Sequence, residues 1–113
     1  MIPAASFEDE ASWSARTTRH AFPDGTPVRV HVAFGPRGAE VSDLGQTLRW
    51  VGDAASGRLL HPRLRAQVMT VCRIEDVVLD AGAFRVHVAP GGDVGEAVER
   101  MARVAERIAH LVS

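Results

Sequence analysis

In the segment Pro27–Phe34, which reads PVRVHVAF, a large apolar side chain occurs at every second position. Period-two alternation of this kind is typical of a half-buried β-strand. The apolar members, expected on one side, are Val28, Val30, Val32 and Phe34. Turn sequences flank the segment at Pro23–Gly25 and Gly35–Gly38, so Thr17–Phe22 and Ala39–Val41 are predicted to complete a three-stranded antiparallel meander.

The middle of the chain predicts two helices. Ser42 is the expected N-cap of the first, and the carboxylate of Asp43 complements its positive start. Gly52 is expected to end that helix, and a loop follows. Pro62 suits the first turn of the second helix, which should end near Ile74. The two apolar stripes are Leu44, Leu48 and Val51, and then Leu64, Val68, Val71 and Cys72.

The last third of the chain predicts a hairpin and a long helix. Apolar alternation on both sides of Asp80–Gly82 indicates that Val77–Val88 is the hairpin. Asp93 is the expected N-cap of the helix, and Glu96 completes a capping box. The apolar stripe of this helix consists of Val94, Val98, Met101, Val104, Ala105, Ile108 and Val112.

Together these elements predict an α+β fold in the order (α)βββααββα. The three-strand meander and the hairpin are expected to form an antiparallel sheet with the helices packed on one face. The bracketed helix is Ser6–Ser14, and residues 1–15 are expected to be a weakly ordered N-terminal segment. The length of 113 residues corresponds to a single domain, 1–113.

Composition narrows the function classes. Hydrophobic residues make up 46% of the chain and charged residues 24%, which is typical of a folded globular protein. The formal net charge of -1 gives no electrostatic surplus for nucleic acid or an anionic membrane. The chain lacks a basic start followed by an apolar run, and it lacks the roughly 20 apolar residues of a membrane span. We therefore expect a cytoplasmic protein.

All thirteen basic residues are arginine, and the chain contains no Lys, Asn or Tyr. The codons of these three absent amino acids are AT-rich, so the bias indicates a GC-rich bacterial genome. Arginine is therefore no special sign of bidentate recognition in this chain.

The pentapeptide Arg-Val-His-Val-Ala occurs in a strand of the meander and again in the hairpin. In both copies Arg and His face away from the valines. If the two strands share a sheet, these side chains form a basic patch for an anion or an acidic partner, helped by protonation of His near a pKa of about 6.5. The alternative is that they are ordinary outward-facing residues of half-buried strands. The four residues are Arg29, His31, Arg85 and His87.

A second basic group lies in the region of the second helix. Phosphate contact by this group is the basis of a nucleic-acid alternative, although no aromatic interleaving or recognition signature accompanies it. Its members are Arg58, Arg63, Arg65 and Arg73.

No recognisable catalytic, metal-binding or cofactor-binding set is present. Cys72 lies on an apolar helical stripe, where cysteine behaves as a small hydrophobe. The five histidines lack the spacing of metal ligands. Pro90–Asp93 precedes a helix, but Asp93 and Glu96 would repel a phosphate there. We predict no catalytic residue, no metal, no cofactor and no small-molecule ligand.

The hexapeptide Ser42–Thr47, which reads SDLGQT, lies between the meander and the first predicted helix. It resembles a Thr/Ser-Asp-x-Gly-x-Thr motif of the bacterial and phage family called domain of unknown function 1828. The resemblance runs from about Thr17 to Leu111, and position 44 is Leu where many relatives carry an acidic residue. It implies a strand hairpin, a helix starting at the motif, a further helix, a hairpin and a terminal helix, with no settled activity. The residues that carry it are Ser42, Asp43, Gly45, Thr47 and Gly52.

The element order is also similar to that of small type III secretion chaperones, which bind partner proteins as dimers. The leading hypothesis is accordingly a non-catalytic, chaperone-like protein-binding module that forms a homodimer. An exposed Trp50 is expected to anchor an interface, and Asp43 and Gly45 join the Arg/His strand face as binding residues. One alternative is a nucleic-acid-associated or phage-defence accessory protein. The other is a small enzyme that uses His31 or His87.

Overall fold

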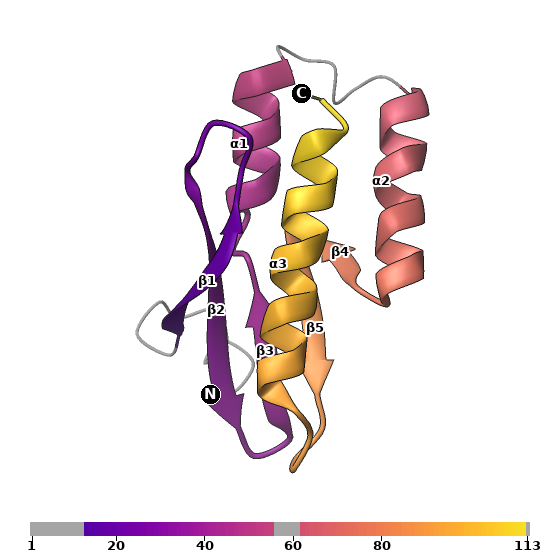
Figure 1. Ribbon diagram of the computed structural model, residues 1–113. Helices are drawn as coiled ribbons and strands as arrows, with labels where there is room; N and C mark the ends of the chain where they lie inside the picture. The colour runs from indigo at the N-terminus through magenta and orange to yellow at the C-terminus, as the bar shows by residue number, and fades with distance from the viewer. Residues whose placement is uncertain (1–12, 56–61, 113) are drawn as a thin grey trace.

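The computed structural model describes residues 13–55 and 62–112. Five strands and three helices alternate along them in the order βββααββα (Figure 1). Their bounds are β1 (Ser14–Ala21), β2 (Pro27–Gly35), β3 (Gly38–Ser42), α1 (Gln46–Ala55), α2 (Pro62–Glu75), β4 (Val78–Asp80), β5 (Ala83–Val88) and α3 (Val94–His110).

The strands form one antiparallel sheet in the order β1-β2-β3-β5-β4. The meander and the hairpin are joined because β5 pairs with β3, with Val41 opposite Val86. The predicted α+β class and the meander-plus-hairpin sheet are confirmed. The predicted helix Ser6–Ser14 lies outside the described residues except at its last two positions, where Trp13 is irregular and Ser14 opens β1.

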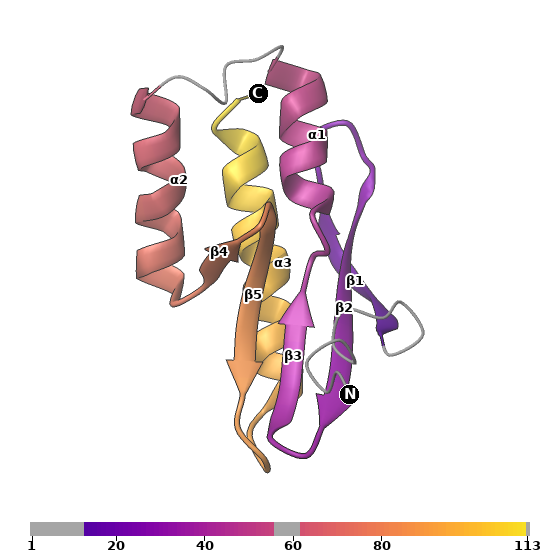
Figure 2. The same cartoon turned by 180° about the vertical axis from the view of Figure 1, so that it is seen from behind.

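One face of the sheet carries the hydrophobic core. The long helix α3 crosses it and contacts β1, β2, β3 and β5, while α1 and α2 pack on α3 from either side (Figure 1). Val28, Val30 and Val32 are fully buried beneath α3, as the alternation of β2 predicted. From behind, β2, β3 and β5 lie in front of α3, and no helix of the described chain covers them (Figure 2). None of the described helices has the length and apolar character that a membrane span requires.

Phe34 departs from the predicted pattern. It continues the alternation of β2 but is 63% exposed. The reason is its position next to the β2–β3 turn, which extends beyond the first turn of α3 (Figure 1). Gly38 in that turn has a φ of +116°, and a Cβ there would lie 2.0 Å from the carbonyl oxygen of Val88. Only glycine fits where the turn lies against the end of β5.

Two predicted limits of the first helix are wrong. Ser42 is the last residue of β3, and α1 begins only at Gln46. Leu44 and Gly45 have φ values of +50° and +87°, so the backbone turns through the left-handed region before the helix starts. Gly52 does not end α1, which continues to Ala55. A glycine inside a helix costs about 1 kcal/mol relative to alanine, and tertiary packing can outweigh that cost.

Ion pairs fix α2 against α3. The Glu75 carboxylate accepts hydrogen bonds from Arg103 at 3.0 and 3.2 Å and from Arg107 at 3.0 Å.

The predicted cap of α3 is confirmed, because the Asp93 carboxylate accepts the Glu96 N–H at 3.0 Å.

His20 joins the edge strand β1 to α3. Its Nδ1 lies 2.8 Å from a Glu106 carboxylate oxygen, and its Nε2 lies 3.0 Å from a Glu99 oxygen. Carboxylates only accept, so both ring nitrogens must carry protons for both bonds to form. The hydrogen bond with Glu106 raises the pKa of His20 above 6.5, against the opposing effect of burial, and Glu99 adds to the increase.

This arrangement predicts a pH-dependent contribution to stability. Because the folded-state pKa of His20 is raised, its stabilisation is complete below pH 6.5 and is lost as pH rises through the folded pKa. The difference in free energy of unfolding between the wild type and His20→Gln should therefore decrease between pH 6 and pH 9 in urea titrations. Glu106→Gln should reduce this pH dependence, and an unchanged pH dependence in Glu106→Gln would contradict the assignment.

Candidate functional site

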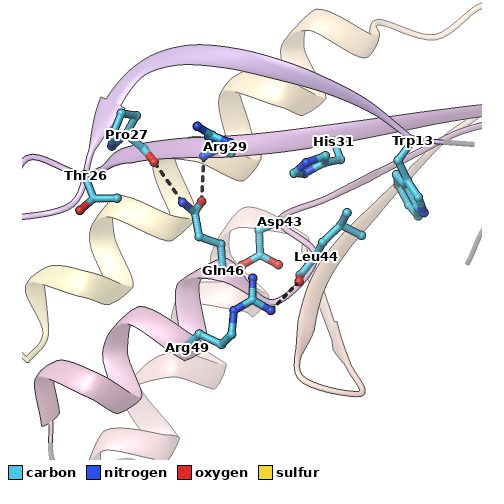
Figure 3. A pocket seen from close by; sticks show the side chains of 9 residues that line it. All are labelled: Trp13, Thr26, Pro27, Arg29, His31, Asp43, Leu44, Gln46 and Arg49. Atoms are coloured by element: carbon cyan, nitrogen blue, oxygen red, sulfur yellow. Dashed lines mark hydrogen bonds between the residues drawn. The ribbon is translucent and has the colours of Figure 1, made fainter. Parts of the chain in front are cut away.

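An open pocket of about 620 Å³ lies on the helix-free face of the sheet, beside the start of α1 (Figure 3). β2, the β3–α1 turn and α1 supply most of its wall. The lining residues are Trp13, Thr26, Pro27, Arg29, His31, Asp43, Leu44, Gln46 and Arg49.

The side chain of Gln46 holds α1 against β2. Its amide oxygen accepts the Arg29 N–H at 2.8 Å, and its amide nitrogen donates to the Pro27 carbonyl at 3.1 Å (Figure 3). β3 ends at Ser42, opposite His31, so it offers no backbone partner to the earlier residues of β2. Gln46 replaces that partner and thereby places the first turn of α1 beside Arg29.

Asp43 is the structural centre of the site. Its buried carboxylate accepts the N–H groups of Gly45, Thr47 and Phe84, each at 3.0 Å. It is only 1% exposed. One side chain therefore joins the end of β3, the start of α1 and the start of β5. Asp43 was expected as a binding residue, and the structure gives it three backbone partners instead of a free oxygen.

The backbone donors before α1 are already occupied. Ser42 Oγ accepts the Leu44 N–H at 3.0 Å, and the Asp43 carbonyl accepts the Gln46 N–H at 3.0 Å. Gly45 allows the backbone of the turn to adopt a φ of +87°. A Cβ at this position would lie 3.3 Å from a guanidinium nitrogen of Arg49. Any charge recognition in the pocket must therefore come from side chains.

Two arginines of the pocket have no paired carboxylate among residues 13–55 and 62–112. Neither Arg29 nor Arg49 has a carboxylate within salt-bridge distance in the described part of the chain. Arg49 donates one hydrogen bond, to the Leu44 carbonyl at 3.3 Å (Figure 3). The cations come from two elements, β2 and α1, and line the same pocket.

His31, two residues after Arg29 on β2, lines the same pocket, and its imidazole has no hydrogen-bond partner in the described chain (Figure 3). Its Nδ1 is buried without a hydrogen-bond partner, and no partner for Nε2 occurs among residues 13–55 and 62–112. Burial lowers the pKa of His31 below 6.5, Arg29 lowers it further, and Asp43 opposes the decrease. The neutral imidazole is therefore the favoured form at pH 7.

The four residues of the predicted Arg/His patch belong to one sheet, but they do not all lie in the same row. His31, Ser42 and Arg85 form one row across β2, β3 and β5 on the helix-free face. His87 is one row further along and pairs with Glu40 of β3. With ordinary strand spacings the Cα atoms of Arg29 and His87 are about 16 Å apart, so they cannot hold one small anion.

Trp50 is half-buried, so the prediction that it is exposed is wrong. Its ring stacks on Phe22 with centroids 5.2 Å apart and planes 9° apart. Its indole N–H donates to Asp24 at 3.1 Å. These contacts give Trp50 a packing role at the β1–β2 turn.

The second predicted basic group is not gathered by the fold. Arg58 lies outside the described residues. Arg63, Arg65 and Arg73 are exposed on α2. Arg63 and Arg65 are two positions apart and do not share a side of the helix.

Among the described residues, no three His, Cys, Asp or Glu side chains are grouped to hold a metal ion.

Sequence reasoning missed Trp13, Gln46 and Arg49 as site residues. Arg49 lies three positions after Gln46 on α1, so the two share a helix side, but nothing local indicates that this side meets β2. The signal for Gln46 was the early end of β3, which leaves the earlier residues of β2 without a backbone partner on that side.

The chain matches no known family model. No curated protein and no solved structure matches it either. The resemblances inferred from the SDLGQT motif and from the element order therefore stay predictions.

The three hydrogen bonds of Asp43 predict a large cost for its removal. Asp43→Ala leaves three N–H groups without their acceptor, and we expect the free energy of unfolding to fall by about 3 kcal/mol or more. The matched control is Asp93→Ala, which removes a single exposed cap and should cost about 1 kcal/mol. Urea denaturation measures both values. Equal losses in the two variants would show that Asp43 is an ordinary cap.

Proposed function

We propose that this protein is a small, non-catalytic, protein-binding module that takes an acidic segment of a partner onto the helix-free face of its sheet. The observation that carries the proposal is a pocket lined by Arg29 and Arg49, neither of which has a carboxylate within salt-bridge distance in the described chain. An acidic group would neutralise charges that the fold leaves uncompensated.

The surroundings of the pocket support a docking role. The row that contains His31 continues to Arg85, whose Nε is buried without a hydrogen bond in the described residues. That nitrogen also forms a long ion pair with a carboxylate oxygen of Asp80, at 4.0 Å. An extended acidic segment that leaves the pocket along this row would meet a further cation, and the net charge of -1 shows that this positive character is local.

Binding explains the site better than catalysis does. A histidine base is normally oriented by a hydrogen bond from its second ring nitrogen to a carboxylate or carbonyl group. His31 has no such bond in the described chain, and the nearby Asp43 carboxylate is committed to three backbone N–H groups. The enzyme alternative therefore lacks the hydrogen bond that would hold the His31 ring in position as a base.

The proposal predicts that a Glu-rich peptide binds through the pocket. The double variant Arg29→Gln/Arg49→Gln should weaken binding about tenfold or more, because two charge contacts are lost. The charge-matched control is Arg65→Gln/Arg73→Gln on α2, which should bind as the wild type does. Fluorescence anisotropy of a labelled peptide at low salt measures both.

Two outcomes would count against the proposal. Equal weakening by the α2 control would mean that binding follows net charge alone. Binding of a DNA or RNA oligonucleotide that only the α2 double variant abolishes would favour the nucleic-acid alternative.

The module is further proposed to be a chaperone-like homodimer in the bacterial cytoplasm, in keeping with the sequence resemblances. Two apolar side chains support self-association: Ile74 at the end of α2 is 64% exposed, and Val78 on the edge strand β4 is 62% exposed. A second copy covering them would remove apolar surface from water.

Light scattering at micromolar concentration should therefore give twice the 12.2 kDa mass of one chain. Ile74→Asp, which places a charge in the interface, should shift the protein to the monomer mass. A wild type that is strictly monomeric would rule out this part of the proposal without affecting the pocket.

A further inference from the structure

The two uncompensated arginines set the charge of the group that fits the pocket. A carboxylate carries one negative charge and is satisfied by one bidentate arginine. A phosphate monoester carries about 1.5 to 2 negative charges at pH 7 and three acceptor oxygens. Arg29 and Arg49 line the pocket from β2 and α1, and two guanidinium groups match the doubly charged group better than one would.

A third donor is available in the same pocket. His31 lacks a hydrogen-bond partner in the described chain, and its neutral ring has one N–H to donate. Because Nδ1 is buried, a phosphate oxygen would accept this hydrogen from Nε2, and no charged imidazole is needed. The site therefore offers two guanidinium groups and one imidazole to the three terminal oxygens.

The acid in the wall, Asp43, opposes this ligand less than an exposed carboxylate would. The carboxylate of Asp43 is 1% exposed and accepts three backbone N–H groups. Those hydrogen bonds orient positive dipoles toward its charge and leave none of these donors to the ligand. Side chains of β2 and α1 thus carry the recognition, and the helix start does not.

The pocket is larger than a phosphate group requires. Its volume of about 620 Å³ lies within the range of small-molecule sites. Trp13 and Leu44 give the wall an apolar part beside the basic one (Figure 3). We propose that the pocket binds a phosphate monoester, with the phosphate between Arg29 and Arg49 and the organic group against Trp13 and Leu44.

This inference rests on the proposed function, because it names the acidic group that the partner presents. A phosphorylated side chain of a protein and a small organic phosphate share this chemistry. The organic group that best suits an indole surface is a flat ring. Phenyl phosphate is therefore the probe, and benzoate, with the same ring and one charge, is its matched comparison.

Calorimetry at pH 7.5 and constant ionic strength tests the inference. We expect phenyl phosphate to bind at least tenfold more tightly than benzoate. Arg29→Gln and Arg49→Gln should each raise the Kd of phenyl phosphate about tenfold, the loss of one charge-assisted contact. Arg65→Gln should leave the Kd unchanged. All three arginines are exposed, and urea denaturation of each variant verifies its fold.

A comparison with a phosphotyrosine peptide identifies the source of the phosphate. A phosphotyrosine peptide that binds more tightly than phenyl phosphate supports a phosphorylated protein, and equal affinities support a small organic phosphate. Equal affinity for benzoate and phenyl phosphate would overturn the inference, while binding of the Glu-rich peptide would keep the proposed function. Phenyl phosphate binding that neither arginine variant weakens would place its site elsewhere. Failure of both phenyl phosphate and the Glu-rich peptide would remove both proposals.

Discussion

The buried carboxylate of Asp43 is the interaction on which the rest of the site depends. A buried carboxylate is costly unless its oxygens are hydrogen-bonded, and here three backbone N–H groups supply those bonds. They come from the turn, from α1 and from β5, which are separated in the chain. The same contact therefore caps a helix, ends a strand and joins the hairpin to the meander. The direction of α1, and with it the position of Arg49, follows from this arrangement.

The pocket is a consequence of where β3 stops. Beyond Ser42 the chain turns through two left-handed residues, so β2 continues without a neighbouring strand on that side. The backbone groups of Pro27 and Arg29 would then need water or a side chain, and Gln46 provides the side chain. A strand that outlasts its neighbour creates a recess, and the first turn of α1 forms the second wall of that recess.

The fold was largely predictable because its signals are local, and the site was not because its contacts are distant. Alternation placed β2 and β5, and capping placed the start of α3. Asp43 was identified as a residue of the helix start, but its bond to Phe84 spans 41 positions and has no local signature. Gly52 shows the opposite error, since a local stop signal did not end α1, which continues to Ala55. Phe34 obeyed the strand period but lay beyond the reach of α3.

The charge of the helix-free face follows from which charges are left unpaired. On the helix side, carboxylates and cations satisfy one another: Glu75 binds Arg103 and Arg107, and Glu99 and Glu106 bind His20. A charge balanced in this way contributes little to recognition at a distance, because its field is cancelled nearby. Arg29 and Arg49 have no such carboxylate in the described chain. A protein with a net charge near zero can therefore still present a locally positive site.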